Sequence, residues 1–433
     1  MKYSPIPNLM FSNNRIRLSE RLAPNSIALI FGAHQMPRTG DQFFPYRQNS
    51  DFFYLTGIEQ EKSILLLYPG NQNKEFNEVL FILKPNKDLE IWEGHKLTIE
   101  EARSQSGINS IKYIDDFDMF LHMALCSCEH VYMNLPEWQK FKSDVLGRDA
   151  DFLKKMQEEY PLHSYKRLAP IIQELRLVKS SQEIDLIKKA CAITREAFLR
   201  VLSSTQPGMM EYEVEAEISY SFLKQGASGH AYAPIVAGGS NACCLHYVEN
   251  DKALADGQLL LLDFGAEYGN YSADLSRTIP VNGRFTARQK AMYEATLRVF
   301  KFARNLMVPG TTINQYHKEV CKKWEEEHIG LGLYTAEQAK NHQGENPLWH
   351  NYFMHGTGHF LGLDVHDVGT RDTVIKAGMV LTCEPGLYVA EEGIGIRIEN
   401  DILITETGPL DLMAGIPIEV EEIESLMLSK ATL

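Results

Sequence analysis

The segment QLLLLDFGAEYGNYSADLSRTIPV (258–281) predicts a β-hairpin, two apolar strands joined by a tight turn around Tyr268–Gly269. In an antiparallel pair about that centre, Asp263 and Asp274 are direct cross-strand neighbours, with Cβ atoms about 5 Å apart on one face. The alternative is a turn aspartate and a surface aspartate. It is disfavoured because an unpaired carboxylate beside a core strand costs free energy. We therefore expect both carboxylates to coordinate cations from one face of a hairpin.

Three later segments carry the same kind of chemistry: HGTGHFLGLDVHD (355–367), TCEPGLY (382–388) and GIRIEND (395–401). With the hairpin they supply one set of candidate metal ligands, Asp263, Asp274, His359, Glu384 and Glu399. Four carboxylates and one imidazole suit hard divalent cations. Carboxylates so close together do not all stay ionised without a metal, because like charges raise one another's pKa. If these residues converge, they predict a dinuclear metal centre, a kind of site that makes and uses hydroxide.

The histidine-rich segment is not a helical zinc motif. His355 and His359 are four residues apart, but Gly-Thr-Gly between them is a poor helix, and Gly356 stands where the zincin motif has glutamate. A lone histidine here would be structural, whereas three within twelve residues indicate function. By period two, Asp364 and His366 are expected on one face of a strand.

Two further residues are ambiguous when each is taken alone. Arg397 and Glu399 are expected on the polar face of a strand, where an exposed ion pair contributes little; the other acidic segments favour a site. His246, in LHYVEN, is equally consistent with a satisfied core histidine and a site residue, and the acidic hairpin that follows it favours the site.

Composition excludes several classes of protein. The chain has 433 residues and a formal net charge of -14, with no long Lys/Arg block. We therefore expect neither a nucleic-acid nor an anionic-membrane partner.

No apolar run approaches the roughly 20 residues that span a bilayer, and the first residues hold no secretory signal core, so we expect a cytoplasmic location. The seven cysteines are scattered and odd in number, which predicts no disulfide framework; Cys243–Cys244 is expected to be buried and reduced.

Two domains are predicted. Residues 1–168 alternate strands (26–33, 63–70, 78–85) with helices (118–128), which is typical of an α/β domain. In residues 169–433, Ser180 and Glu183 form a capping box at a helix start, and Thr286 with Gln289 caps a later helix. Pro-Gly pairs at 207–208 and 309–310 each precede a helix, a faint sign of a duplicated helix-plus-hairpin unit.

The chain resembles the pita-bread metallopeptidases and, within them, bacterial-type aminopeptidase P. The resemblance rests on YRQNSDFFYLTGIEQ, EIWEG, KSSQEIDLIKKA, LHYVEN, YSADLSRTIPVNGRFT, HGTGHFLGLDVHDVG and GIRIENDILITETG, which run from residue 46 to 408. It implies a creatinase/prolidase-like α/β domain (1–168) and an α+β pita-bread catalytic domain (169–433). Loops 368–379 and 389–399 are shorter than in the best-known bacterial relatives, so substrate-length preference could differ.

The resemblance also implies roles. Asp263 would bind one metal ion, His359 and Glu384 the other, and Asp274 and Glu399 would bridge them; the usual metal is Mn²⁺. Glu384, His366, His246 and Arg397 would be catalytic, and His246, His355, His366, Tyr232, Asp41 and Trp92 would bind substrate, Trp92 by reaching into a neighbouring subunit's site. The implied reaction is hydrolysis of the N-terminal Xaa-Pro bond of a peptide by a metal-bridging hydroxide, in a homodimer or homotetramer.

Alternatives remain open. A prolidase shares the two-domain layout and acts on Xaa-Pro dipeptides alone. A creatinase-like, metal-free hydrolase and a non-catalytic peptide-binding module on the same scaffold are less favoured, because all five ligand positions are intact. Methionine aminopeptidase lacks an N-terminal domain of this kind, and none of the cysteines has the sequence context of a nucleophile.

Overall fold

The computed structural model describes residues 2–137 and 147–429, and the chain divides into two compact units. One unit comprises Ser4–Arg176, and the other comprises Leu177–Leu433 with the first three residues. The division falls one helix later than residue 168. Helix α7 (Ala169–Leu177) is held to the first unit because the Tyr54 hydroxyl donates to the Leu175 carbonyl (3.2 Å) and Arg176 pairs with Asp51 (2.7 Å). The boundary at 168 stays a prediction.

The first unit is built on a mixed sheet of six strands in the order β6-β5-β4-β1-β7-β8. The strands are β1 (Ser26–Phe31), β4 (Ile64–Leu67), β5 (Glu78–Ile82), β6 (Ser110–Tyr113), β7 (His130–Met133) and β8 (Ser164–Arg167). The first three of these confirm the strands expected at 26–33, 63–70 and 78–85. A short hairpin, β2 (Pro37–Thr39) with β3 (Gln42–Phe43), stands apart from this sheet.

Helices complete the α/β unit. They are α1 (Asn8–Ser19), α2 (Ser50–Thr56), α3 (Lys87–Glu93), α4 (Ile99–Ser106), α5 (Phe117–Leu125), α6 (Arg148–Glu159) and α7. Helix α5 is the helix expected at 118–128. Its apolar face supplies Phe117 and Leu121 to a core that also contains Phe31, Phe81 and Val131 from the sheet.

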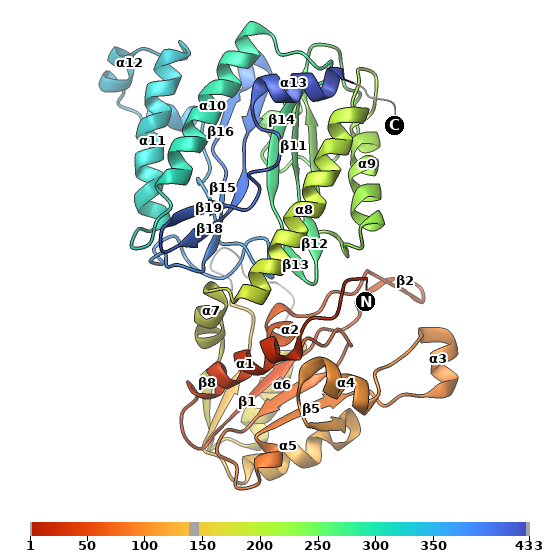
Figure 1. Ribbon diagram of the computed structural model, residues 1–433. Coiled ribbons are helices and arrows are strands. Elements are labelled where there is room, and N and C mark those ends of the chain that lie inside the picture. The colour runs from red at the N-terminus through yellow and green to blue at the C-terminus, as the bar shows by residue number, and fades with distance from the viewer. Residues whose placement is uncertain (1, 138–146, 430–433) are drawn as a thin grey trace. The chain divides into compact units, whose positions relative to one another are not determined.

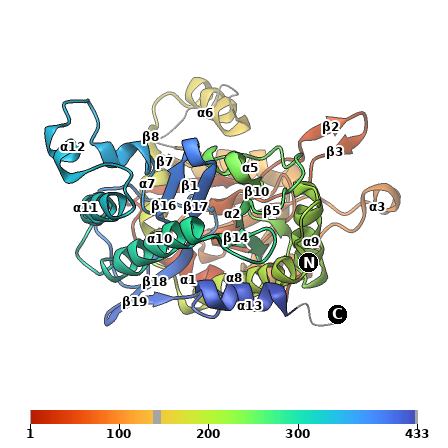
Figure 2. The ribbon, with the colours of Figure 1, turned by 90° about the horizontal axis from the view of Figure 1, so that it is seen from above.

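The second unit contains two helix pairs that lie side by side in both views (Figures 1 and 2). The first pair is α8 (Ser181–Ser204) with α9 (Glu211–Lys224), and the second is α10 (Ala287–Asn305) with α11 (Ile313–Gly330). The predicted capping boxes are present: Ser180 and Glu183 begin α8, and Thr286 and Gln289 begin α10. Helices α12 (Ala336–Asn341) and α13 (Val420–Leu428) follow.

Each helix pair is followed by a three-stranded antiparallel sheet of longer strands, and a third three-stranded sheet of shorter strands also follows the first pair. After α8 and α9 come β10 (Ile235–Gly238), β11 (Leu259–Phe264) and β14 (Leu275–Pro280); after α10 and α11 come β15 (Val380–Cys383), β18 (Asn400–Thr405) and β19 (Gly408–Asp411). Shorter strands complete the unit: β9 (Gly229–His230), β12 (Ala266–Tyr268), β13 (Tyr271–Ser272), β16 (Gly386–Val389) and β17 (Ile394–Arg397). This order matches the duplicated unit that the two Pro-Gly pairs suggested.

The predicted register of the central hairpin is wrong by two residues. The turn residues are Gly269 and Asn270, both with positive φ (59° and 65°), as a two-residue type I′ turn requires. Asp263 is therefore opposite Ser276 rather than Asp274. Because side chains alternate with a period of two, a shift of two residues keeps both aspartates on one face as diagonal neighbours.

Three smaller expectations also change. Residues 361–369 form bends rather than a strand, so Asp364 and His366 do not share a strand face. The strand expected through Arg397 and Glu399 is interrupted, because β17 ends at Arg397 and β18 begins at Asn400. All seven cysteines are free, but Cys244 is exposed and Cys243 only partly buried, so that pair is not a core element. Among the described residues, no helix is long and apolar enough to cross a membrane.

Candidate metal centre

The two hairpin aspartates meet at one tyrosine. The Tyr232 hydroxyl donates to Asp263 Oδ1 at 2.6 Å and also contacts Asp274 Oδ1. A phenol has one hydrogen, so it satisfies one of the two carboxylates at a time. The second contact needs a proton on Asp274 or a cation between the groups. Asp263 and Asp274 are thus brought together as the sequence predicted, on one face of the hairpin.

His359 lies against the same group of carboxylates. Its Nε2 is 3.4 Å from Asp274 Oδ2 and 3.8 Å from Glu384 Oε1. Its Nδ1 is 3.0 Å from the Phe360 carbonyl, which can only accept, so Nδ1 carries the hydrogen and Nε2 presents a lone pair. A histidine oriented by a backbone carbonyl in this way is the usual arrangement of a metal ligand.

Glu399 completes the cluster from the break between β17 and β18. One ligand atom each from Asp274, His359 and Glu399 lie within 4.8 Å of one another. The Glu399 backbone N–H donates to the Ser276 carbonyl (3.0 Å), and the Ser276 hydroxyl donates to Glu399 Oε2 (2.6 Å). These two hydrogen bonds hold Glu399 against the hairpin.

A buried arginine connects the remaining groups. Arg397 donates from Nη2 to Asp263 Oδ2 (2.5 Å), from Nε to the Ser276 hydroxyl (2.8 Å) and from Nη1 to the Tyr388 hydroxyl (2.8 Å). Arg397 is 4% exposed. Sequence reasoning missed Ser276 and Tyr388. The correct register, which places Ser276 opposite Asp263, would have indicated the first; nothing in the sequence pattern points to the second.

Burial and mutual repulsion dominate the electrostatics of the cluster. Burial, followed by the charges of Asp263 and Asp401, raises the pKa of Asp274 well above its usual value. Burial, followed by Asp274 and Glu384, does the same to the pKa of Glu399. The carboxylates therefore resist full ionisation unless positive charge is supplied.

Three more histidines surround the cluster in different ways. His355 shares a hydrogen bond with Tyr388 through Nε2 (2.8 Å), and its Nδ1 is 3.7 Å from Glu384 Oε2. Burial and then Arg397 lower the pKa of His355 to about 3, which keeps it neutral. The exposed His366 places its ring 4.2 Å from the ring of His359. His246 is exposed and close enough to His355 to affect its pKa.

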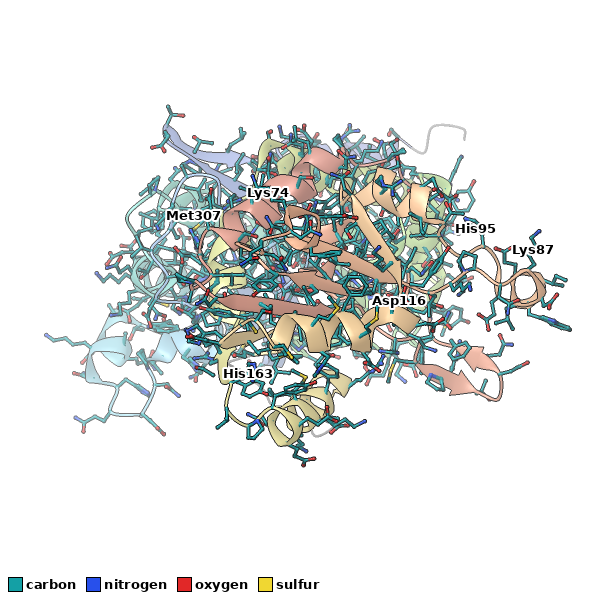
Figure 3. The ribbon with its side chains drawn as sticks, turned by 90° about the horizontal axis from the view of Figure 1, so that it is seen from below. Lys74, Lys87, His95, Asp116, His163 and Met307 are labelled. Atoms are coloured by element: carbon teal, nitrogen blue, oxygen red, sulfur yellow. The ribbon has the colours of Figure 1, made fainter. Side chains whose placement is uncertain are left out.

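Two sequence candidates lie in the first unit. Asp41 sits between β2 and β3, where it is exposed and accepts a hydrogen bond from Gln42 Nε2 (3.1 Å). Trp92 is in α3 and is 86% exposed. Figure 3 labels Lys87 and His95 at the two ends of this segment, whose side chains extend away from the rest of the unit. Their predicted roles in substrate binding stay predictions.

The donor set fits divalent cations. It offers carboxylate oxygen atoms from Asp274 and Glu399 and one lone pair from His359, and a bound cation would relieve the repulsion that raises the pKa values of Asp274 and Glu399. Glu384 and Asp263 flank the three convergent ligands through His359 and Tyr232 respectively.

Comparisons with known proteins agree with this geometry. Residues 185–406 match the model of metallopeptidase family M24, and residues 11–132 match the aminopeptidase P N-terminal domain. The chain is 36% identical to a Xaa-Pro aminopeptidase of Haemophilus influenzae (98% of each chain covered) and 37% identical to one of Escherichia coli (98% and 99%). A solved structure, zinc-substituted Escherichia coli aminopeptidase P in complex with product, superposes with a TM-score of 0.87 at 36% identity, covering 99% and 100% of the two chains.

Fold and site together define a metallo-exopeptidase with a pita-bread catalytic domain. More closely, the chain belongs to the aminopeptidase P family, as the sequence resemblance indicated.

Proposed function

We propose that this protein is a Xaa-Pro aminopeptidase, which hydrolyses the bond between the first residue of a peptide and a proline in second position. One observation carries the proposal. The convergent group Asp274, His359 and Glu399 lies in a chain whose Xaa-Pro aminopeptidase relatives match it along 98% of its length.

The proposed cofactor is a pair of divalent cations held by Asp263, Asp274, His359, Glu384 and Glu399. When bound, such a pair supplies Lewis acidity and lowers the pKa of water towards neutrality. Manganese is the proposed metal, because a site with mostly oxygen ligands suits Mn²⁺.

The chain's own residues perform the proton transfers. Glu384 is the proposed general base: its carboxylate faces both His359 and His355, and it would take a proton from the attacking water and pass it to the leaving proline nitrogen. His366, whose exposed ring lies against His359, would donate a hydrogen bond to the oxyanion that forms at the scissile carbonyl. Arg397 and Tyr232 would keep Asp263 and Asp274 in place during the reaction.

Selection of proline follows from its chemistry. Proline has a fixed φ and offers no backbone N–H, so a shaped pocket can accept its ring without leaving a donor unsatisfied. His246, His355 and Tyr232 are the proposed lining of that pocket, with Asp41 as a supporting group. Trp92 is proposed to reach the site of a neighbouring copy in a homodimer or homotetramer, a role that its 86% exposure permits.

The proposed location is the cytoplasm. All seven cysteine thiols are free, which fits a reducing compartment.

A matched peptide panel tests the function. Protein loaded with Mn²⁺ is assayed on Xaa-Pro, Xaa-Pro-Xaa and Xaa-Ala-Xaa, with and without a chelator. We expect release of the first residue from Xaa-Pro-Xaa, suppression by chelator and no cleavage of Xaa-Ala-Xaa. Cleavage of the dipeptide alone would make the protein a prolidase, and no cleavage despite bound metal would refute the proposed substrate.

A further inference from the structure

Thr357 is the central residue of the HGTGH segment. It is fully buried between Gly356 and Gly358. Packing requires glycine at position 358, because a Cβ there would lie 2.2 Å from the Thr382 carbonyl oxygen, whereas a Cβ on Gly356 would clash only with the end of the Arg371 side chain (2.5 Å). The Thr357 carbonyl accepts the backbone N–H of Glu384 at 2.9 Å. The position of Thr357 therefore determines where the Glu384 backbone lies.

The side chain of Thr357 is fixed by a histidine from a distant helix. His317, on α11, shares a hydrogen bond between its Nδ1 and the Thr357 hydroxyl (2.8 Å). The His317 ring also packs on Phe353, with centroids 5.8 Å apart, and Phe353 packs on His355 at 4.8 Å. One imidazole thus supports the histidine segment at two points, at Thr357 directly and at His355 through Phe353.

The His317 ring is neutral, and both of its nitrogen atoms have partners. Burial, and then the charge of Arg371, lower the pKa of His317 to about 4, so the ring is neutral at physiological pH. Its second nitrogen, Nε2, is 3.4 Å from the Cys321 thiol one helical turn away. Both ring nitrogens therefore have partners, and the ring cannot turn without breaking a contact.

We propose that His317 is a positioning residue for the metal centre, which acts by clamping Thr357 and thereby fixing Glu384 and the histidine segment. The expected effect of His317 on catalysis rests on the proposed function. The expected effect of His317 on metal binding does not. His317 touches neither metal nor substrate in this role; it limits the motion of groups that do. Its side chain belongs to none of the sequence motifs of the site.

Five variants test the clamp. His317→Phe keeps a ring but removes the hydrogen bond, whereas His317→Asn places an amide near the position of Nδ1 and keeps it. Thr357→Val is close in shape to threonine without the hydroxyl, and His317→Phe with Thr357→Val removes both partners. The matched control is His328→Asn: His328 is fully buried on the same helix, but its hydrogen-bond partner is the Tyr334 hydroxyl (3.3 Å). Titration calorimetry with Mn²⁺, thermal unfolding, and kcat and KM on a Xaa-Pro-Xaa peptide are measured for each.

We expect His317→Phe and Thr357→Val each to weaken Mn²⁺ binding and to lower kcat about tenfold, as loss of a partner behind a metal ligand does, with KM changed less than about twofold. The double variant should be no worse than either single variant, because the two share one interaction. His317→Asn should keep Mn²⁺ affinity and kcat near their wild-type values. The control, His328→Asn, should change only thermal stability. If His317→Phe folds poorly, the comparison of Thr357→Val with His317→Asn tests the clamp instead.

Wild-type Mn²⁺ affinity in both His317→Phe and Thr357→Val would overturn the clamp, as would additive losses in the double variant. If the wild-type protein binds Mn²⁺ but cleaves no Xaa-Pro peptide, the proposed function fails, and the affinities of the same variants still decide the clamp.

Discussion

Replacing Arg397 by methionine removes a side chain that connects three parts of the metal centre. Methionine has about the length of the arginine stem, so the change deletes the guanidinium while leaving most of the packing. The lost contacts are the charged hydrogen bond to Asp263 (2.5 Å) and those to the hydroxyls of Ser276 and Tyr388 (2.8 Å each). Ser276 is also the partner of Glu399, so the change reaches two proposed metal ligands at once.

The magnitude follows from burial. The Arg397 and Asp263 side chains are 5% and 13% exposed, and breaking a buried ion pair by removing one partner costs about 3–5 kcal/mol. We expect the lower end, because the proposed cations would partly compensate the charge on Asp263. If about 3 kcal/mol is lost from transition-state stabilisation, kcat/KM falls on the order of 100-fold.

The assay compares Arg397→Met with Arg298→Met. Arg298 makes a bidentate pair with Glu327, but its side chain is 54% exposed, so its loss should cost about 0–1 kcal/mol and leave turnover unchanged. Kinetics on a Xaa-Pro-Xaa peptide, metal content by elemental analysis and the thermal midpoint are measured for both. An Arg397→Met protein within about threefold of wild-type kcat/KM, with full metal content, would show that the buried network does not support catalysis.

Three other changes have definite expected outcomes. Asp274→Ala should abolish peptide cleavage and lose at least one metal ion by elemental analysis; full turnover with two metals would contradict the ligand assignment. Gly265→Ala should destabilise the central hairpin strongly, because the new Cβ would lie 1.6 Å from the Ala273 carbonyl oxygen; an unchanged thermal midpoint would refute this. Burial lowers the pKa of His328 to about 4, so between pH 6.5 and 4 the unfolded chain binds a proton that the folded chain excludes. Wild-type stability should therefore fall by about 3 kcal/mol more than that of His328→Asn as pH drops through this window, measured by urea unfolding; parallel pH profiles would contradict it.

Local helices and strands, and the types of candidate ligand, could be predicted from residues that are close together along the chain. Capping boxes at Ser180 and Thr286 involve residues three apart, so their side-chain geometry is set by the helix start alone. The strand at 26–33 follows from a continuous apolar run. The family and the fold class that the motifs predicted are confirmed, and Asp274, His359 and Glu399 lie together as expected, whereas Asp263 and Glu384 as metal ligands stay predictions.

The side chains that support the site follow from long-range packing, whereas the register of the hairpin could have been inferred from its turn residues. The hairpin centre depends on which two residues adopt positive φ; glycine and asparagine tolerate it whereas tyrosine does not, so turn chemistry favours Gly269 with Asn270, and the strand pairing has this centre. Ser276, Tyr388 and His317 act on groups that lie far away along the chain, and no periodicity links residues across such distances. The periodicity of a segment predicts which face of its helix or strand a side chain occupies. Which residue it contacts on that face depends on long-range packing, which is defined only in the folded chain.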